Sequence, residues 1–229
     1  MVRLLLFDID GTLVLTGGAG SRAMTRAFAQ THGLEDALKT VDLAGRTDRI
    51  IMRDALTNAG LPHEDVDVDA FRAAYSAALR EEIGKPGNGR RGLLPGVRPL
   101  LERLAERDDV RLALLTGNFR VSAEIKLAEF DVWRYFTWGA FADDAIERDD
   151  LIAVAHARHE TEHGHAIEPD SVVIIGDTPH DIRCARAGGA KVVAVATGNY
   201  DLAALERHKP DALFADLTDT DAVLAALLS

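Results

Sequence analysis

The sequence predicts an α/β protein whose core is a Rossmann-like, doubly wound parallel sheet, interrupted by an inserted α-helical cap domain. From Leu93 to the C-terminus, short apolar runs alternate with segments that carry apolar residues at helical spacing. That alternation is typical of a parallel sheet with helices on both faces. The second observation is a lone apolar run at 2–7, which is followed by helical patterning up to residue 82.

The predicted elements follow one another in a regular order. The first strand, 2–7, is apolar throughout and ends before a Gly turn, which is the pattern of a buried parallel strand. Helices are predicted over 19–31, 46–59 and 64–82. The later elements are helix 97–107, strand 111–115, helix 120–129, strand 135–138, helix 149–163, strand 172–175, helix 179–187, strand 191–196, a short strand near 212–214 and a final helix.

This order divides the chain into two domains. We expect the α/β core to comprise 1–15 and 93–229, and the helical cap to comprise 16–92. Gly residues stand at both crossings, at Gly17-Gly18 and in the segment 84–92. Glycine at these places suits a hinge between core and cap, although it is equally suited to simple turns.

Composition excludes several classes of function. The net charge is −11, from 26 Lys and Arg against 37 Asp and Glu, which argues against a surface for nucleic acid or anionic membrane. No apolar stretch approaches the roughly 18 residues that a membrane span needs. The single cysteine, Cys184, excludes an intramolecular disulfide and fits a reducing compartment. We therefore expect a cytoplasmic monomer or homodimer that acts on a small molecule.

Carboxylates follow two of the predicted strands. Asp8 and Asp10 come where the first apolar run breaks, while Asp177 closes the run at 172–175 and Asp181 follows four residues later. In open α/β sheets, ligands bind at the carboxyl ends of the strands. Carboxylates there can share a hard cation, and one can attack an electrophile. Taken singly, each motif is also compatible with ordinary turn chemistry after a strand.

A third strand ends in small polar residues. Thr116, Gly117 and Asn118 follow the strand 111–115. A hydroxyl group and free backbone amides at a strand-to-helix turn suit phosphate oxygens, although the same residues could serve only as a helix cap. Three polar strand ends in one parallel sheet favour a functional site over three unrelated turns.

With these motifs the chain resembles the haloacid dehalogenase-like hydrolase superfamily along its whole length. The matching motifs are Asp-x-Asp-Gly-Thr at 8–12, the Thr after the double Leu at 114–116, and Gly-Asp-Thr-x-x-Asp at 176–181. The helical insertion lies where the phosphoglycolate phosphatase-like group carries a cap. The resemblance implies a Mg²⁺-dependent phosphatase that hydrolyses a small phosphomonoester, of phosphoglycolate or sugar-phosphate type, through an aspartyl-phosphate.

The resemblance also implies roles for the carboxylates. Asp8 would be the nucleophile, and Asp10 would protonate the leaving oxygen and later activate water. Mg²⁺ would be held by the Asp8 carboxylate, the Asp10 backbone carbonyl and Asp177. Asp181 would hold the metal-binding residues in place without touching the metal, or would bind the metal through a water molecule. Because family dehalogenases lack the second Asp of this motif, Asp10 favours cleavage of a phosphate ester.

Phosphate binding would fall to Thr116 and the amides of Gly117 and Asn118. The family also uses a Lys, commonly in a Lys-Pro context between the second and last motifs, and this chain has no Lys-Pro dipeptide there. Arg148, just before the helix 149–163, is the favoured replacement, since it can neutralise Asp8 and bind a phosphoryl oxygen. Lys126, otherwise expected on the solvated face of its helix, is the alternative.

The cap should select the substrate. Arg46 is a candidate for clamping a substrate anion, and Gly18 for lining the pocket. The equally weighted alternative is that Thr47 or Asp48 caps a helix and Arg46 faces solvent. Two other functions remain open at this point: a phosphosugar mutase with the same nucleophile and acid, and a non-catalytic module that binds phosphate or regulates.

Overall fold

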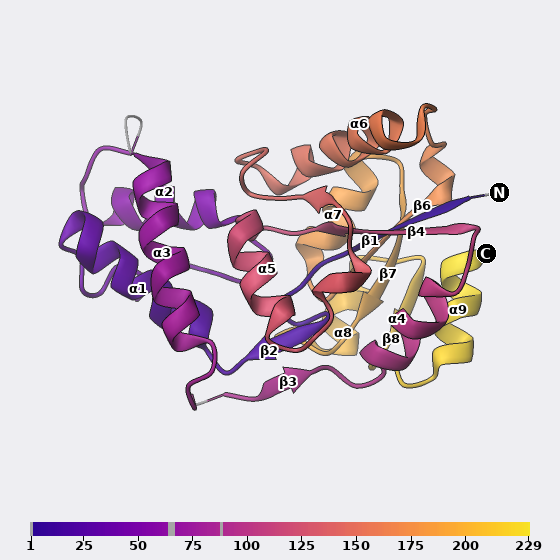
Figure 1. The fold of residues 1–229 in the computed structure, drawn as a ribbon, viewed down its shortest axis with the longest axis horizontal. Coiled ribbons are helices and arrows are strands. Elements are labelled where there is room, and N and C mark those ends of the chain that lie inside the picture. Colours follow the sequence, from indigo (N-terminus) through magenta and orange to yellow (C-terminus); the bar gives the residue numbers. More distant parts are fainter. Residues whose placement is uncertain (1, 64–66, 88) are drawn as a thin grey trace.

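A six-stranded parallel sheet forms the centre of the molecule (Figure 1). The computed structural model describes residues 2–63, 67–87 and 89–229. The strand order is β5-β4-β1-β6-β7-β8. In chain order these strands are β1 (Arg3–Phe7), β4 (Val110–Leu115), β5 (Gly139–Ala140), β6 (Val172–Gly176), β7 (Lys191–Val195) and β8 (Ala212–Phe214). Since β1 lies between β4 and β6, the three motif-bearing strands are neighbours.

Both faces of the sheet are buried. Side chains of β1 alternate between two apolar clusters, with Leu4 and Leu6 in one and Leu5 and Phe7 in the other. The first cluster is covered by α6 (Leu151–His163), α7 (Pro179–Ala187) and α8 (Leu202–Glu206). The second is covered by α4 (Val97–Ala105), α5 (Arg120–Ala128) and α9 (Thr220–Leu228). This confirms the predicted doubly wound α/β core and explains why β1 is apolar throughout.

Three helices form a separate layer beside the core, at the left of Figure 1. They are α1 (Ala19–His32), α2 (Asp48–Asn58) and α3 (Val68–Glu82). A third apolar cluster joins them, with the rings of Phe28 and Phe71 only 4.6 Å apart between centroids. Residues 64–66, where the predicted third helix begins, and residue 88 in the Gly-rich segment lie outside the described residues, as does residue 1.

A two-stranded antiparallel ribbon connects this helical layer to the core. The chain leaves through β2 (Val14–Thr16) and returns through β3 (Arg91–Leu93). Both predicted domain borders, at 15/16 and 92/93, fall inside this ribbon. The division into core and cap at those borders stays a prediction.

One predicted strand is wrong. Residues 135–138 were expected to form a strand, but Trp133–Tyr135 is a 3₁₀ turn and β5 contains only Gly139 and Ala140. The apolar character of the segment reflects packing, because the Phe136 ring meets Phe7 edge-on with centroids 5.8 Å apart. In the described part of the chain, no helix is both long and apolar enough to cross a membrane.

Candidate active site

Asp8 is buried directly after the central strand. Only 4% of the residue is exposed, and its backbone N–H donates to the Ile175 carbonyl of β6 at 2.9 Å. Burial raises the pKa of the Asp8 carboxyl to about 6, although the guanidinium of Arg148 opposes this shift. Arg148 Nη2 lies 3.3 Å from Asp8 Oδ2. The structure therefore places the predicted nucleophile beside a cation.

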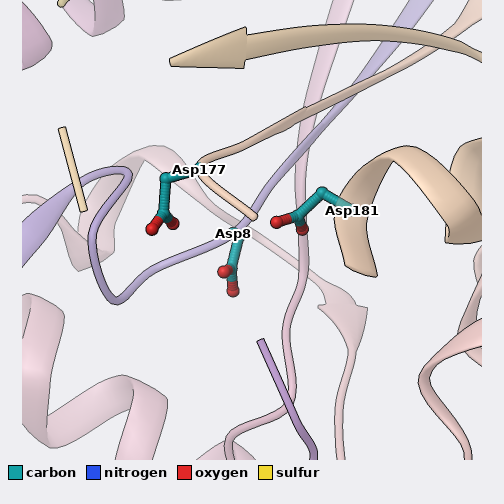
Figure 2. A group of neighbouring side chains, drawn as sticks. All are labelled: Asp8, Asp177 and Asp181. Carbon is teal, nitrogen blue, oxygen red and sulfur yellow. The ribbon is translucent and has the colours of Figure 1, made fainter. Parts of the chain in front are cut away.

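Asp177 and Asp181 join Asp8 to form a cluster of three buried carboxylates (Figure 2). Each residue offers one carboxylate oxygen to the cluster, and these three oxygens all lie within 4.8 Å of one another. Burial raises the pKa of Asp177 well above its usual value, and the negative charges of Asp181 and Asp8 raise it further. Three carboxylates at such separations need compensating positive charge to be anions together. Arg148 supplies one positive charge, against Asp8 and Asp181, so the donor set still fits a hard divalent ion such as Mg²⁺.

The three carboxylates differ in how strongly the protein already holds them. Asp181 is engaged at both oxygens: Arg148 donates to Oδ1, and the N–H and hydroxyl of Thr178 donate to Oδ2 at 3.0 and 2.7 Å. The hydrogen bond to Asp177 falls on one oxygen, where Thr12 Oγ1 donates to Oδ1 at 3.0 Å. This pattern favours Asp177 as a direct metal ligand and Asp181 as a residue that orients the others.

The glycine of the first motif is required by a close approach. Gly11 has φ +85°, and a Cβ atom there would lie 2.4 Å from Asp177 Oδ2. Its carbonyl accepts a hydrogen bond from Thr197 Oγ1 at 2.5 Å. The backbone after Asp10 therefore turns past the Asp177 carboxylate at a distance that only glycine permits.

Asp10 is hydrogen-bonded to Lys126, a residue that was expected to face solvent. Lys126 Nζ donates to Asp10 Oδ2 at 2.6 Å, and Asn118 Nδ2 donates to the same oxygen at 2.8 Å. The expectation that Lys126 lies on a solvated face is wrong, since only 4% of it is exposed. Its helix packs against α3 as well as the core, so a position that looks exterior in an isolated helix is covered. No local sequence pattern signals this.

The two candidate cations thus serve different carboxylates. Arg148 contacts Asp8 and Asp181, whereas Lys126 contacts Asp10. Burial alone would lower the pKa of Arg148, but the charges of Asp181 and Asp8 raise it, so it stays a cation. The position of Arg148 matches the role predicted for it, and that role stays a prediction.

Thr116, Gly117 and Asn118 form a tight turn after β4. Thr116 is fully buried, and its hydroxyl accepts a hydrogen bond from Asn118 Nδ2 at 2.8 Å. The Gly117 carbonyl accepts from the N–H of Asp48 in the helical layer at 2.6 Å. The turn therefore lies where the sheet's end meets the helical layer. The contacts of the Asn118 side chain were not predicted, because only its backbone amide had been considered.

A cavity of about 500 Å³ opens at this junction. Gly18 and Arg46, the two cap residues predicted to meet substrate, both line it, as do Asp10, Lys126 and Asp177. Arg46 Nη2 also donates to Asp54 Oδ2 at 2.5 Å. Thr47 Oγ1 accepts from the Ile50 N–H at 3.1 Å, so the helix-cap interpretation is confirmed for Thr47. Substrate binding by Arg46 stays a prediction.

Comparison with known proteins decides the family. A family model described as haloacid dehalogenase-like hydrolase matches residues 5–186, which include all the motifs above. The chain belongs to the haloacid dehalogenase-like hydrolase family. It is therefore an enzyme of the hydrolase class, as the sequence resemblance implied.

Individual relatives and solved structures are similar to this chain over most of its length. Phosphoglycolate phosphatase 1 of Pseudomonas aeruginosa is 27% identical over 224 residues, covering 95% of this chain and 78% of the relative. Tyrosine-protein kinase PtkA of Mycobacterium tuberculosis is 30% identical over 201 residues, covering 86% of this chain and 62% of the kinase. The structure of CbbY from Rhodobacter sphaeroides in complex with phosphate matches this haloacid dehalogenase-like fold with a TM-score of 0.71, 20% identity and full coverage of both chains.

Proposed function

We propose that this chain is a Mg²⁺-dependent phosphatase that hydrolyses a small phosphomonoester, of phosphoglycolate or sugar-phosphate type, through an aspartyl-phosphate. The observation that carries the proposal is the pairing at the end of β1. Asp8 is buried beside Arg148, and Asp10, two residues on, faces the cavity. Similarity to a protein named phosphoglycolate phosphatase supports the substrate class.

In the first step a carboxylate oxygen of Asp8 attacks phosphorus, and the bond between phosphorus and the ester oxygen breaks. Asp10 donates its proton to that oxygen, which leaves as an alcohol. Arg148, Thr116 and the amides of the 116–118 turn would hold the phosphoryl oxygens and stabilise the charge that develops on them. Asp8 is then an acyl phosphate and Asp10 a carboxylate.

In the second step Asp10 accepts a proton from water, whose oxygen attacks phosphorus. The bond between phosphorus and the Asp8 oxygen breaks, so the Asp8 carboxylate is restored and inorganic phosphate leaves. Mg²⁺, when held by the Asp8 carboxylate, the Asp10 backbone carbonyl and Asp177, supplies positive charge that offsets the charge of the phosphoryl group. Asp181 orients Arg148 throughout.

Phosphate release from a panel of phosphorylated metabolites, with and without Mg²⁺, tests the proposal. We expect turnover of at least one small phosphomonoester, with phosphoglycolate and sugar phosphates as the first candidates. Chelation of divalent cations and the Asp8→Asn variant should each abolish it. Turnover that survives either treatment would refute the mechanism.

Product analysis in the same experiment separates the other functions. A phosphosugar mutase would convert a sugar 1-phosphate to an isomer in place of free phosphate. A non-catalytic module would bind phosphate analogues and release no phosphate from any member of the panel. The proposed phosphatase passes the phosphoryl group to water, so at the end of the reaction free phosphate and alcohol should be present in equal amounts.

A further inference from the structure

Lys126 has a defined relation to Asp10 that the family pattern does not assign. We propose that Lys126 is a positioning residue for Asp10, and that with Asn118 it fixes which Asp10 oxygen carries the proton. This inference rests on the proposed function, because it concerns the acid of that reaction. It gives Lys126 a role distinct from that of Arg148.

The hydrogen bonds to Asp10 are unsymmetrical. Lys126 Nζ and Asn118 Nδ2 both donate to Oδ2, at 2.6 and 2.8 Å. A carboxyl oxygen that accepts two such donors has no room for a proton of its own. When Asp10 is the acid, its proton must therefore reside on Oδ1. The Asp10 side chain is 44% exposed and lines the cavity, so a substrate can reach it.

Lys126 and Asn118 are also bound to each other. Lys126 Nζ donates to Asn118 Oδ1 at 2.6 Å, and the Asn118 amide nitrogen donates to both Asp10 Oδ2 and Thr116 Oγ1. The three groups form a closed triangle of hydrogen bonds. Such a triangle restricts the last torsion of Asp10, which is otherwise broad and roughly two-fold in aspartate. Asp10 is thereby presented in one orientation.

The cap completes the surroundings of Lys126. Gly20, at the start of α1, lies against the ammonium group, since a Cβ atom there would be 3.5 Å from Lys126 Nζ. The same Cβ would be 3.6 Å from the hydroxyl of Tyr75 on α3. With the cap in this position only 6% of the Lys126 side chain is exposed. Water therefore competes little for the ammonium group, and its bonds to Asp10 and Asn118 are strengthened.

Asp10 Oδ1 can carry the proton in both steps of the reaction. In the first, the proton on Asp10 Oδ1 passes to the ester oxygen as the bond to phosphorus breaks. In the second, Oδ1 takes a proton from the attacking water. Lys126 loses no proton in either step, because it only holds Oδ2. Lys126 should therefore matter most where the leaving oxygen needs a proton.

Leaving-group dependence tests this role. Lys126→Met removes the ammonium group and keeps the length of the side chain. We expect kcat/KM for an alkyl phosphomonoester to fall on the order of 100-fold, which is typical for loss of general acid catalysis. For p-nitrophenyl phosphate, whose leaving group is stable as an anion, we expect a fall of less than about 5-fold. The ratio kcat/KM is the right quantity because it reports the step that forms the phosphoenzyme.

Two further variants distinguish loss of the proposed Lys126 role from a folding defect in Lys126→Met. Asn118→Ala removes the other donor to Asp10 Oδ2 while keeping the backbone amide, and should give the same selective loss. Lys39→Met is the matched control, since Lys39 is an exposed cap residue paired with Asp36. Lys39→Met should leave kcat/KM unchanged for both the alkyl phosphomonoester and p-nitrophenyl phosphate. Urea unfolding of each variant shows whether the fold is retained.

Chemical rescue gives an independent readout. Lys126→Cys, alkylated with 2-bromoethylamine, regains an ammonium group at nearly the original length. Position 126 lines the cavity, so a reagent can reach a cysteine there. The natural Cys184 is fully buried, and burial raises the pKa of its thiol to about 12, so the new cysteine should react selectively. We expect alkylation to restore activity on the alkyl ester.

Equal losses on both substrates, or no loss on either, would overturn the proposal. So would failure of the alkylated Lys126→Cys protein to regain activity on the alkyl ester. These results differ from a failure of the proposed function itself, which would appear as an inactive wild-type protein.

Discussion

At the scale of single residues, the site holds two cations that contact different carboxylates. Arg148 lies against Asp8 and Asp181 in the core, and Lys126 lies against Asp10 under the cap. Arg148 is 2% exposed, so its removal would leave two buried carboxylates without the cation that neutralises them. Lys126 instead controls a carboxylate that is open to the cavity.

This division predicts different responses to mutation. Arg148→Ala should lower kcat/KM for every phosphomonoester, including p-nitrophenyl phosphate, because Arg148 contacts the nucleophile and not the acid. Lys126→Ala should spare p-nitrophenyl phosphate. Arg148→Ala should also destabilise the fold by about 3–5 kcal/mol, the usual cost of breaking a buried ion pair.

Steady-state kinetics with p-nitrophenyl phosphate and urea unfolding measure these two effects. Arg148→Lys is the control that keeps the positive charge without the fork of two donor nitrogens. A larger loss for Lys126→Ala than for Arg148→Ala on p-nitrophenyl phosphate would reverse the assignment.

At the scale of elements, the start of α2 is docked onto the turn after β4. The Asp48 N–H donates to the Gly117 carbonyl at 2.6 Å, and the Phe119 N–H donates to Asp48 Oδ2 at 2.8 Å. Nearby, Thr47 Oγ1 donates to the Ile146 carbonyl at 2.6 Å. These reciprocal bonds hold the start of α2 against the predicted phosphate-binding turn. The same contacts bury the carboxylate of Asp48.

Burial raises the pKa of Asp48 from 3.8 to about 7, with Lys126 opposing the shift and Asp10 and Asp143 adding to it. Between these values the folded protein binds more protons than the unfolded chain. The contribution of Asp48 to stability is therefore complete below about pH 4 and is lost as the pH rises through 7. At about 1.4 kcal/mol per pH unit, the loss is on the order of 4 kcal/mol at most.

Asp48→Asn should remove this dependence while keeping an acceptor for the Phe119 N–H. We expect the free energy of unfolding to fall less steeply from pH 4 to pH 7 in the variant than in the wild type. Denaturant unfolding across that range measures the difference. Parallel pH profiles for the two proteins would show that Asp48 does not titrate in this way.

At the scale of the whole molecule, the features that local sequence encodes were predictable. The apolar character of β1, β4 and β6 follows from burial on both faces of a parallel sheet, and the polar residues after each strand mark where it ends. Because parallel strands end at one edge, Asp8 and Asp177 could be expected to lie together. The structure brings them into one cluster.

Features that depend on distant contacts were not predictable. Lys126 contacts Asp10 across 116 positions of sequence, and its burial depends on how α3 packs against α5. The strands β2 and β3 are three residues each, and they exist only because they pair with one another. In both cases the contact is made with a residue far away in the chain, and no periodic sequence pattern indicates it.

Trapping the phosphoenzyme tests the central claim most directly. The protein is mixed with a phosphomonoester it hydrolyses and with Mg²⁺, quenched in acid within the first turnover, digested with pepsin at low pH and analysed by mass spectrometry. The account predicts a phosphoryl group on Asp8 that forms before free phosphate appears and decays as phosphate is released. Phosphate release with no phosphoryl group on Asp8, or release that continues in Asp8→Asn, would contradict it.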